Sequence, residues 1–111
     1  MLRRPRRLRA NKAIRNLVRE TKLNVEDFIY PLFIVPGEGI KKEIDTLPGQ
    51  YHLSVDEAVK MAQEVYDLGI LGVEIFGIPT YKDEQGSSAW DMEQPVQQAI
   101  TAIRKAVPNL L

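Results

Sequence analysis

The side chains that could carry chemistry in this sequence are few, and none has an obvious partner. Glu74 is the single charge inside the apolar run 68–79, where an unpaired carboxylate is costly. We expect it to face a basic group or the wet end of that run; a catalytic carboxylate is the alternative. His52 is the only histidine. Because a general base needs a positioned partner and none is evident, we expect His52 to be structural. Lys82 stands beside Asp83, which favours a solvated charge pair over a desolvated Schiff-base lysine.

Several classes of site have no counterpart among the 111 residues. The chain has no cysteine, which excludes disulfides and thiolate metal sites and is compatible with a reducing compartment. The short Gly-containing stretch 36–39 is neither a dinucleotide nor a Walker loop. No apolar run approaches a membrane span, and Arg15 and Arg19 interrupt the only candidate for a secretory leader.

The net charge of zero hides a strong asymmetry along the chain. Residues 1–19 hold eight cations and no acid, so the remainder carries seven cations and all fifteen acids, a net charge of −8. Three partners could suit this basic arm. Nucleic acid would favour aromatic residues among Arg3–Arg9, and a membrane surface would need a larger apolar face than Leu2 and Leu8 make. Docking on an acidic neighbouring subunit fits best.

The periodicity predicts three helices and two strands. A short helix follows Asn11, its expected N-cap, and has the polar residues on one side. The dense apolar run 28–36 predicts a first strand, with Pro31 at an early or unpaired position, and 37–51 predicts a long loop. Ser54 and Glu57 form a capping-box pattern before a helix that ends at Gly69.

The second half of the chain repeats the order of strand and helix. The run 71–78 predicts a strand buried on both faces, and Pro95 begins a last helix that Pro108 stops. This alternation predicts parallel βαβ units of an α/β protein, with 108–111 entering a further strand. Binding sites open at the carboxyl ends of such strands, where Phe76 could form an apolar wall and Gly77 could admit a ligand; a core residue and a simple turn are the alternatives.

Seven short motifs, in the same order and spacing, resemble those of the porphobilinogen synthase (5-aminolevulinate dehydratase) family. They are Arg4-Pro-Arg-Arg-Leu-Arg9, Tyr30-Pro-Leu-Phe-Ile34, Leu47-Pro-Gly49, Phe76-Gly-Ile-Pro79, Lys82-Asp83, Gly86-Ser87 with Ala89, and Gln97–Lys105. The departure lies at Met92–Pro95, where many members have Asp-Gly in place of Glu-Gln-Pro. The departure concerns only the start of the last helix.

The resemblance implies a TIM (β/α)8 barrel of which this chain holds only the beginning. Residues 1–23 would be the basic arm with its short helix, and residues 24–111 the first two βα units. Such an enzyme, a hydro-lyase, condenses two molecules of 5-aminolevulinate to porphobilinogen with loss of water, on the way to haem and other tetrapyrroles. The family's Schiff-base lysines, its carboxylate-binding arginines and its zinc or magnesium ligands lie further along its sequence. We therefore expect no catalytic residue and no metal ligand in this chain.

Two residues carry over from the family. Phe76 matches the aromatic that walls the substrate pocket at the end of the second strand. Arg9 matches an arm residue that, in members with an allosteric magnesium, approaches the ion's water shell across a subunit boundary. The family's arm wraps a neighbouring subunit in a homo-octamer, which agrees with the charge asymmetry.

The sequence thus predicts the opening part of a cytoplasmic porphobilinogen synthase, with no nucleic-acid or membrane partner and no activity by itself. One alternative is a non-catalytic assembly or interaction fragment, which would co-purify with full-length subunits. The other is a small basic-armed nucleic-acid-binding domain, which would be retained on DNA in a steeply salt-dependent way.

Overall fold

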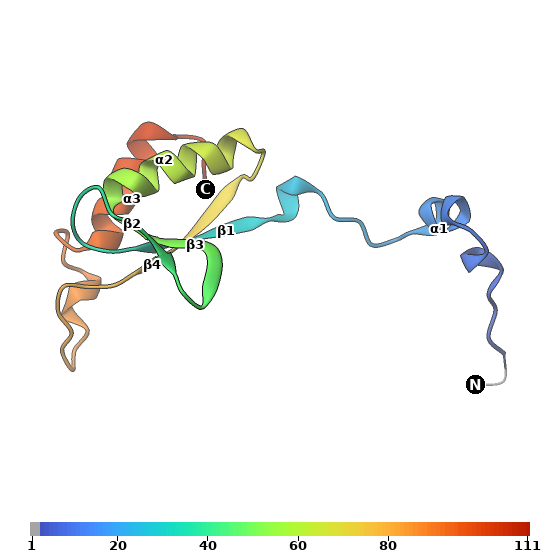
Figure 1. The fold of residues 1–111 in the computed structure, drawn as a ribbon, viewed down its shortest axis with the longest axis horizontal. Helices are drawn as coiled ribbons and strands as arrows, with labels where there is room; N and C mark the ends of the chain where they lie inside the picture. The colour runs from blue at the N-terminus through green and yellow to red at the C-terminus, as the bar shows by residue number, and fades with distance from the viewer. Residues whose placement is uncertain (1–2) are drawn as a thin grey trace.

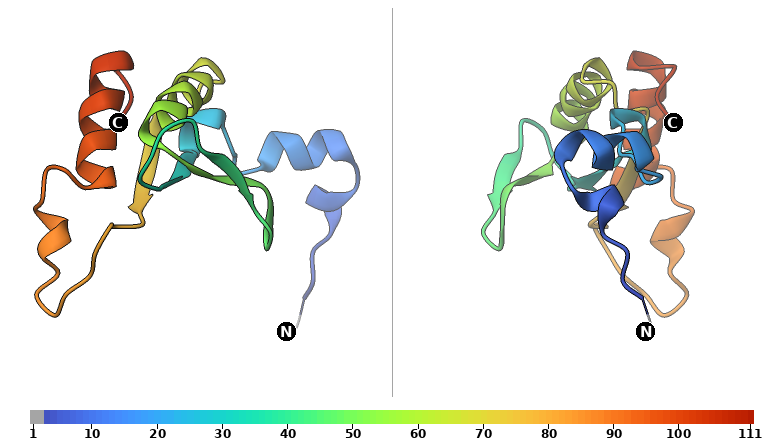
Figure 2. Two further views of the ribbon diagram at one scale, coloured as in Figure 1. Left: turned by 60° about the vertical axis from the view of Figure 1, so that its left-hand side comes forward. Right: turned by 90° about the vertical axis from the view of Figure 1, so that its right-hand side faces the viewer.

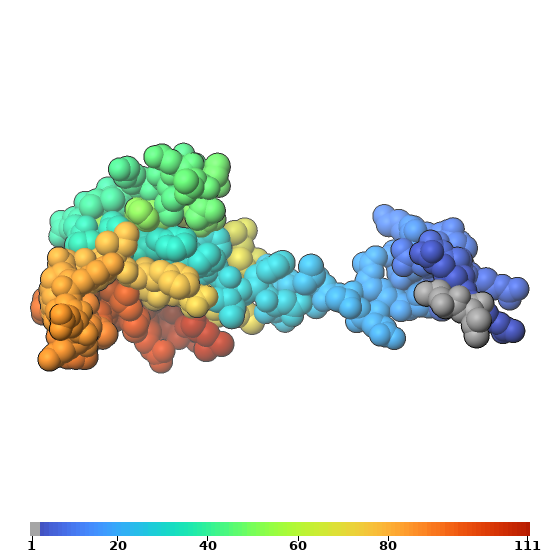
Figure 3. Space-filling view, turned by 90° about the horizontal axis from the view of Figure 1, so that it is seen from below, coloured from blue at the N-terminus to red at the C-terminus, as the bar shows by residue number. Residues whose placement is uncertain are grey.

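The chain divides visibly into an extended arm and a body (Figure 1). The computed structural model describes residues 3–111; Met1 and Leu2, the start of the expected arm, lie outside the described residues. The arm contains a 3-10 helix, η1 (Arg7–Arg9), and helix α1 (Lys12–Val18). An extended segment and a second 3-10 helix, η2 (Val25–Asp27), join it to the body, and the space-filling view shows the arm standing apart (Figure 3).

Helix α1 begins as the sequence predicts but leaves its apolar side uncovered. The Asn11 Oδ1 accepts a hydrogen bond from the Ile14 N–H at 3.0 Å, which confirms Asn11 as the N-cap. No residue of α1 is buried, and the Leu17 side chain is 85% exposed. A helix of two turns is marginal in water without packing. Within residues 3–111, therefore, no other element packs on the apolar face of α1 to stabilise the helix.

The body is built on a four-stranded sheet in the order β2-β3-β1-β4. Its strands are β1 (Ile29–Ile34), β2 (Lys41–Ile44), β3 (Leu47–Leu53) and β4 (Gly72–Gly77). Strand β1 runs parallel to both β3 and β4, and β2 is antiparallel to β3. Helices α2 (Val55–Asp67) and α3 (Pro95–Ala106) lie on one side of the sheet (Figure 2), and a 3-10 helix, η3 (Ser87–Ala89), interrupts the loop before α3.

The segment 37–51, predicted to be a long loop, is instead mostly a β-hairpin, so that prediction was wrong. Strands β2 and β3 pair across it and project from the body (Figure 2). The hairpin has little buried surface, so its strands lack the apolar alternation that marks a half-buried strand. Pro48 and Gly49 also suggested a break, yet both lie near the turn, where Gly49 takes a φ of +83°.

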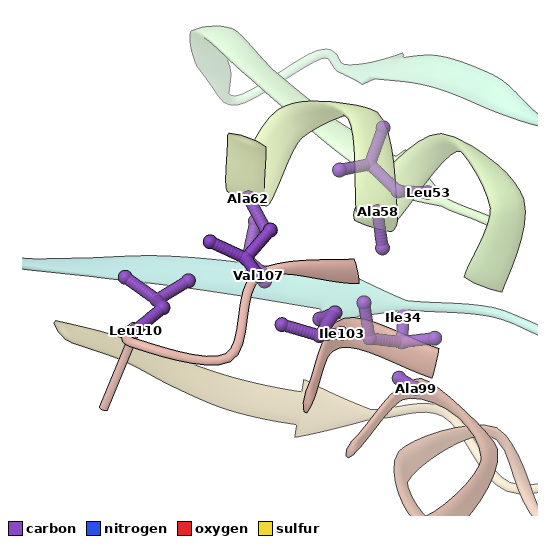
Figure 4. Packing of buried hydrophobic residues seen from close by; sticks show 9 residues of the cluster. Ile34, Leu53, Ala58, Ala62, Ala99, Ile103, Val107 and Leu110 are labelled. Carbon is purple, nitrogen blue, oxygen red and sulfur yellow. The ribbon is translucent and has the colours of Figure 1, made fainter. Parts of the chain in front are cut away.

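The core fills the space between one face of the sheet and the two helices (Figure 4). Leu32 and Ile34 of β1 point toward the helices and are almost fully buried. The buried residues of the helices and of the segment after α3 are Ala58, Ala62, Val65, Ala99, Ile103, Val107 and Leu110. The five within the helices, Ala58, Ala62, Val65, Ala99 and Ile103, follow the helical spacing read from the sequence, so the positions of both helices were predicted correctly.

The sequence predicted that strand β4 is buried on both faces, and that prediction was wrong. Val73 and Ile75 are half-buried toward the helices, whereas Glu74 and Phe76 are exposed on the other face. The reason is that β4 lies at the edge of a sheet whose second face is uncovered in the described residues. The sheet face that carries Phe76 is therefore mostly apolar, and no second layer of the described residues covers it.

The last residue, Leu111, already pairs with the open edge of β4. Its N–H donates to the Leu71 carbonyl, and its own carbonyl accepts from the Val73 N–H, both at 2.9 Å. This alternation of donor and acceptor is that of a parallel neighbour. Of the segment 108–111, predicted to enter a further strand, Leu111 has this pairing, whereas 108–109 form a turn.

The capping box predicted at Ser54 is absent. Its side chain makes no bond to the free N–H groups of α2. Instead the buried Ser54 Oγ accepts from the Ile40 N–H at 3.0 Å, and its hydroxyl donates to the Asp56 carboxylate. The Asp56 carboxylate also accepts from the Gly39 N–H, and the Ser54 hydroxyl is the main cause of its lowered pKa. Ser54 thus fastens the chain before β2 to the start of α2.

Replacing Ser54 by alanine is expected to lower the free energy of unfolding by about 1–3 kcal/mol. The Ile40 N–H would lose its side-chain acceptor in a place that water does not reach freely. Urea denaturation followed by circular dichroism measures the effect. Thr101→Ala removes a hydroxyl that bonds a carbonyl on the exposed side of α3, and should change stability by less than about 0.5 kcal/mol. Equal losses of stability in the two variants would contradict the role of Ser54 in joining the chain before β2 to α2.

Candidate functional site

The carboxyl ends of β1 and β4 carry a row of ring-bearing side chains on the uncovered face. Phe33 and Phe76 are partners in the β1–β4 register, and their rings stack with centroids 5.5 Å apart and planes 21° apart. On the other side of β1 from β4, His52 of β3 is the register partner of Phe33. Phe76 is 46% exposed. The two phenylalanines form an apolar surface, with His52 beside it, at the end of the sheet where ligands of α/β proteins bind.

A polar loop, residues 78–94, leaves β4 at this same end and projects from the body (Figure 2). The buried Gln94 holds its two ends together, because Oε1 accepts from the Thr80 N–H and Nε2 donates to Thr80 Oγ1, each at 2.9 Å. Further along, Gln97 Nε2 of α3 donates to the Ala89 carbonyl at 2.5 Å. The loop is therefore tied to α3 at two points.

Two aspartates shape the interior of the loop. Asp83 Oδ1 accepts from the backbone N–H of Ser87 at 2.8 Å, and Asp91 Oδ1 accepts from that of Glu93 at 2.9 Å. The Ser87 hydroxyl and N–H lower the pKa of Asp83. The pKa of Asp91 is lowered mainly by the Glu93 N–H and also by Tyr81, whose hydroxyl donates to the carboxylate. In each case the charged form is the one that is hydrogen-bonded.

The loop should consequently lose order at acid pH. Because the pKa of each carboxyl is lower in the folded state, its stabilising effect is present above the ordinary value of 3.8 and is lost as the pH falls through the folded pKa. Trp90, the only tryptophan, adjoins Asp91 and is 66% exposed, so its fluorescence reports on the loop. We expect a constant spectrum down to about pH 4 and a change below that value.

A matched variant identifies the group responsible for this change. Asp91→Asn keeps the shape of the side chain but cannot titrate, and should reduce the acid change in Trp90 fluorescence. Far-UV circular dichroism recorded in parallel follows the helices. A fluorescence change that is identical in the Asn variant would show that Asp91 does not control the loop.

Gly77 has a packing role that neither interpretation of the sequence included. A methyl group at Gly77 would collide with Cγ2 of Val96, on the first turn of α3, and would lie 3.5 Å from its Cβ. The glycine is therefore required for the close approach of α3 to β4. A hollow of about 290 Å³ beside it is lined by residues of this helix start and of the loop, Pro79 and Ala89 among them.

For two other residues singled out in the sequence, one detail differs from the prediction: the pairing of Lys82 and the element that carries His52. Lys82 and Asp83 form no ion pair; the single ion pair recorded in residues 3–111 joins Lys60 to Glu57 at 3.0 Å. The Asp83 carboxylate is instead engaged by the backbone of its own loop. His52 lies on strand β3, half-buried, and not in a loop. The short Asp83–Ser87 spacing is a local turn signal that could have revealed the first of these.

Arg9 lies in η1 of the arm, and Phe76 lies in β4; Figure 1 shows the arm apart from the body that contains β4. It lines a hollow of about 390 Å³ between η1 and α1, together with Leu8, Arg15, Val18 and Arg19. The structure thus gathers three guanidinium-bearing residues around one concave surface of the arm. Arg9 and Phe76, the two residues carried over from the family resemblance, belong to separate places in one chain.

Residues 3–111 contain no group of three His, Cys, Asp or Glu side chains placed to hold a metal ion. None of the helices described there is both long enough and apolar enough to cross a bilayer.

Comparisons with known proteins agree with each other. A family model described as "Delta-aminolevulinic acid dehydratase" matches residues 2–111. A protein of that name from Synechococcus elongatus is 55% identical over 108 residues, covering 97% of this chain and 33% of the relative. One from Synechocystis sp. is 52% identical with the same coverage. The chain spans about a third of the length of these relatives.

A solved structure extends the similarity to the fold. It is that of delta-aminolevulinic acid dehydratase (porphobilinogen synthase) from Toxoplasma gondii in complex with the reaction product porphobilinogen. It aligns with 100% of this chain and 32% of its own, with a TM-score of 0.84 and 30% sequence identity.

Proposed function

Because this chain belongs to the delta-aminolevulinic acid dehydratase family, we propose that it supplies the first part of an enzyme that condenses two molecules of 5-aminolevulinate to porphobilinogen. The main support for this proposal is the alignment of the whole chain with a product-bound structure of that enzyme at a TM-score of 0.84. The expected fold, the opening βα units of a TIM barrel, is confirmed by the same alignment. Residues 1–23 are the proposed arm and residues 24–111 the proposed barrel units.

In this proposal Phe76 forms part of the wall of the substrate pocket. Its support is the position of the side chain at the carboxyl end of β4, stacked on Phe33. In a TIM barrel the side of the sheet opposite the helices is the barrel interior, and active sites open at the carboxyl ends of the strands. The Schiff-base lysines and the zinc or magnesium ligands would come from chain beyond residue 111, and a cytoplasmic location stays a prediction.

A chimaera tests the proposal. This chain replaces the corresponding third of the Synechococcus elongatus relative, and porphobilinogen formation from 5-aminolevulinate is compared with that of the relative and of the chain alone. We expect product from the chimaera and none above background from the chain alone, because the lysines whose nucleophilic amines would form Schiff bases with the substrate are expected beyond residue 111. A folded chimaera without product would contradict the proposed function. Product from the 111 residues alone would contradict their predicted inactivity.

Truncating the proposed wall should weaken substrate binding. Phe76→Ala in the chimaera is expected to raise KM for 5-aminolevulinate by about 10-fold or more, since an apolar pocket contact is lost. Phe28→Ala serves as the control, because Phe28 is similarly exposed, at 49%, but lies outside the strands. An unchanged KM in Phe76→Ala, or an equal rise in both variants, would remove Phe76 from the pocket.

We propose assembly through the arm as the second function of the chain. The uncovered apolar side of α1 and the basic hollow around Arg9 support it, since an arm of eight cations suits a body of net charge −8 in another subunit. The proposed assembly is a homo-octamer, and in it Arg9 would lie at the boundary with a neighbouring subunit. Sedimentation of the chimaera with and without residues 1–23 should show smaller species without the arm. Salt-dependent retention on DNA with unchanged sedimentation would favour the nucleic-acid alternative.

A further inference from the structure

The Gln97 side chain, on the first turn of α3, leaves half of its amide without a partner. Its Nε2 donates to the backbone carbonyls of Ser88 and Ala89, which fixes the positions of the amide nitrogen and oxygen, because only the nitrogen can donate. Gln97 Oε1 is the one buried side-chain oxygen or nitrogen recorded in residues 3–111 without a hydrogen-bond partner. Nearly all buried polar groups in proteins have a partner. This oxygen is therefore an acceptor for a donor from outside the described chain.

Gln97 belongs to the lining of the hollow of about 290 Å³ beside Gly77. A side chain at position 77 would point at α3, so the hollow lies on the helix side of β4, between the loop 78–94 and the start of α3. The Phe33–Phe76 stack stands on the opposite face of the sheet, because side chains alternate along a strand. The hollow is thus separate from the proposed substrate pocket.

The lining of this hollow is uncharged. None of its residues is ionisable, and its walls include Pro79, Ala89 and Val96. A charged molecule such as 5-aminolevulinate would lose its water there without meeting a countercharge, which is costly. A single water, whose share of the liquid is about 30 Å³, would fill only a small part of the space. Apolar walls with few polar groups are typical of sites for small neutral molecules.

Two polar groups of the lining could orient such a molecule. Gln97 Oε1 can accept a hydrogen bond, and the half-buried Ser88 can donate one, since its hydroxyl takes part in none of those recorded in residues 3–111. Gln94, a third polar residue of the lining, is already bound to Thr80 through both ends of its amide. A ligand that matches the two groups has a donor and an acceptor side by side. This is the arrangement of a carboxamide or lactam edge.

We propose that this hollow binds a small neutral molecule with a carboxamide or lactam edge, whose N–H donates to Gln97 Oε1 and whose carbonyl accepts from the Ser88 hydroxyl. The apolar part of the molecule would contact walls such as Pro79. Because Ser88 belongs to the loop 78–94 and Gln97 to α3, the bound molecule would tie the loop to the helix at a further point. The inference goes beyond the proposed function and does not depend on it.

The test compares two compounds that differ in the donor alone. The probe is 2-pyrrolidinone, a lactam, and the matched compound is cyclopentanone, which has the same ring size and carbonyl but a methylene in place of the N–H. Each is titrated into the ¹⁵N-labelled chain, and the indole N–H resonance of Trp90, the only tryptophan, reports binding next to Ala89. We expect a dissociation constant of about 1 mM for 2-pyrrolidinone and binding about 10-fold weaker for cyclopentanone.

Two substitutions assign the two hydrogen bonds. Gln97→Met keeps the length of the side chain but lacks the acceptor, so the two compounds should bind equally weakly. Ser88→Ala removes the donor to the carbonyl that both compounds share, so both should bind about 3- to 10-fold more weakly with their ratio unchanged. Gln98→Met, at an exposed neighbouring position on α3, is the matched control and should leave both dissociation constants unchanged.

Other outcomes would overturn the proposed site. Equal dissociation constants of the two compounds in the unsubstituted chain, or no saturable binding, would show that water alone occupies the hollow. A ratio that persists in Gln97→Met would place the lactam elsewhere. Far-UV circular dichroism checks the folding of each variant. Should Gln97→Met unfold because its bond to Ala89 is lost, the unsubstituted chain and Ser88→Ala still decide.

Failure of this inference is distinguishable from failure of the proposed function. The titrations measure binding to the chain alone and need no turnover. Porphobilinogen formation by the chimaera tests the proposed function and does not involve the two compounds. Either result can therefore contradict one proposal and leave the other intact.

Discussion

Replacing Ile34 by alanine is expected to lower the free energy of unfolding of the chain by about 2–5 kcal/mol. Ile34 is fully buried, with 0% of its surface exposed, and lies in the cluster that joins β1 to both helices (Figure 4). Truncation removes apolar contacts and leaves a cavity, because its small neighbours Ala58 and Ala99 cannot expand into the space. Such a loss is a large fraction of the stability of a small domain.

The same strand supplies the control. Ile29 is the same residue type in β1 but is 67% exposed, so Ile29→Ala should change the free energy of unfolding by no more than about 0.5–1 kcal/mol. Urea denaturation of the two variants and the unsubstituted chain, followed at a helical circular-dichroism band, gives the comparison. Similar losses in both variants would mean that the core does not lie between β1 and the helices.

The elements with their own periodicity could be predicted from the sequence. Ala58, Ala62 and Val65 recur at helical spacing, and all three are buried against the sheet. Gly69 ends that helix with a φ of +94°, as a C′ glycine should, and Pro95 begins the next one. These signals lie within a few residues of the structure they determine, and no distant contact is needed to read them.

Features that depend on distant or absent partners could not be predicted in this way. The hairpin of β2 and β3 has few buried side chains, so its pairing leaves no apolar pattern in the sequence. The exposed face of β4 was misread because an apolar run indicates that a strand has an apolar environment, but not which polypeptide provides it. In this chain the helices cover Val73 and Ile75, whereas nothing in the described residues covers Phe76.

The candidate site shows the same division. The sequence places Phe76 at the end of a strand, and the structure agrees, but the stacking on Phe33 follows only from the parallel register. The packing role of Gly77 was missed for a related reason. A glycine at the end of a strand serves equally well for a ligand or for a packed helix, and only the position of α3 distinguishes the two.

Gly77→Ala is expected to destabilise the chain by about 1–3 kcal/mol, although it adds a single methyl group. The new Cβ would meet Cγ2 of Val96, whose β-branched side chain has few alternative rotamers on a helix. Either α3 moves away from β4 or the valine leaves its preferred rotamer. Urea denaturation measures the loss, and the fluorescence of Trp90 reports whether the loop before α3 moves with the helix.

A double-mutant cycle identifies the cause. Val96→Ala removes the methyl groups that collide, so the loss caused by Gly77→Ala should be much smaller in the Val96→Ala background than in the unsubstituted chain. Interaction energies of roughly 0.5–3 kcal/mol are usual for residues in contact. Additive effects would instead point to backbone strain at position 77, and the φ of Gly77 is not in the left-handed region where such strain arises. The collision with α3 is therefore the physical reason that a glycine ends β4.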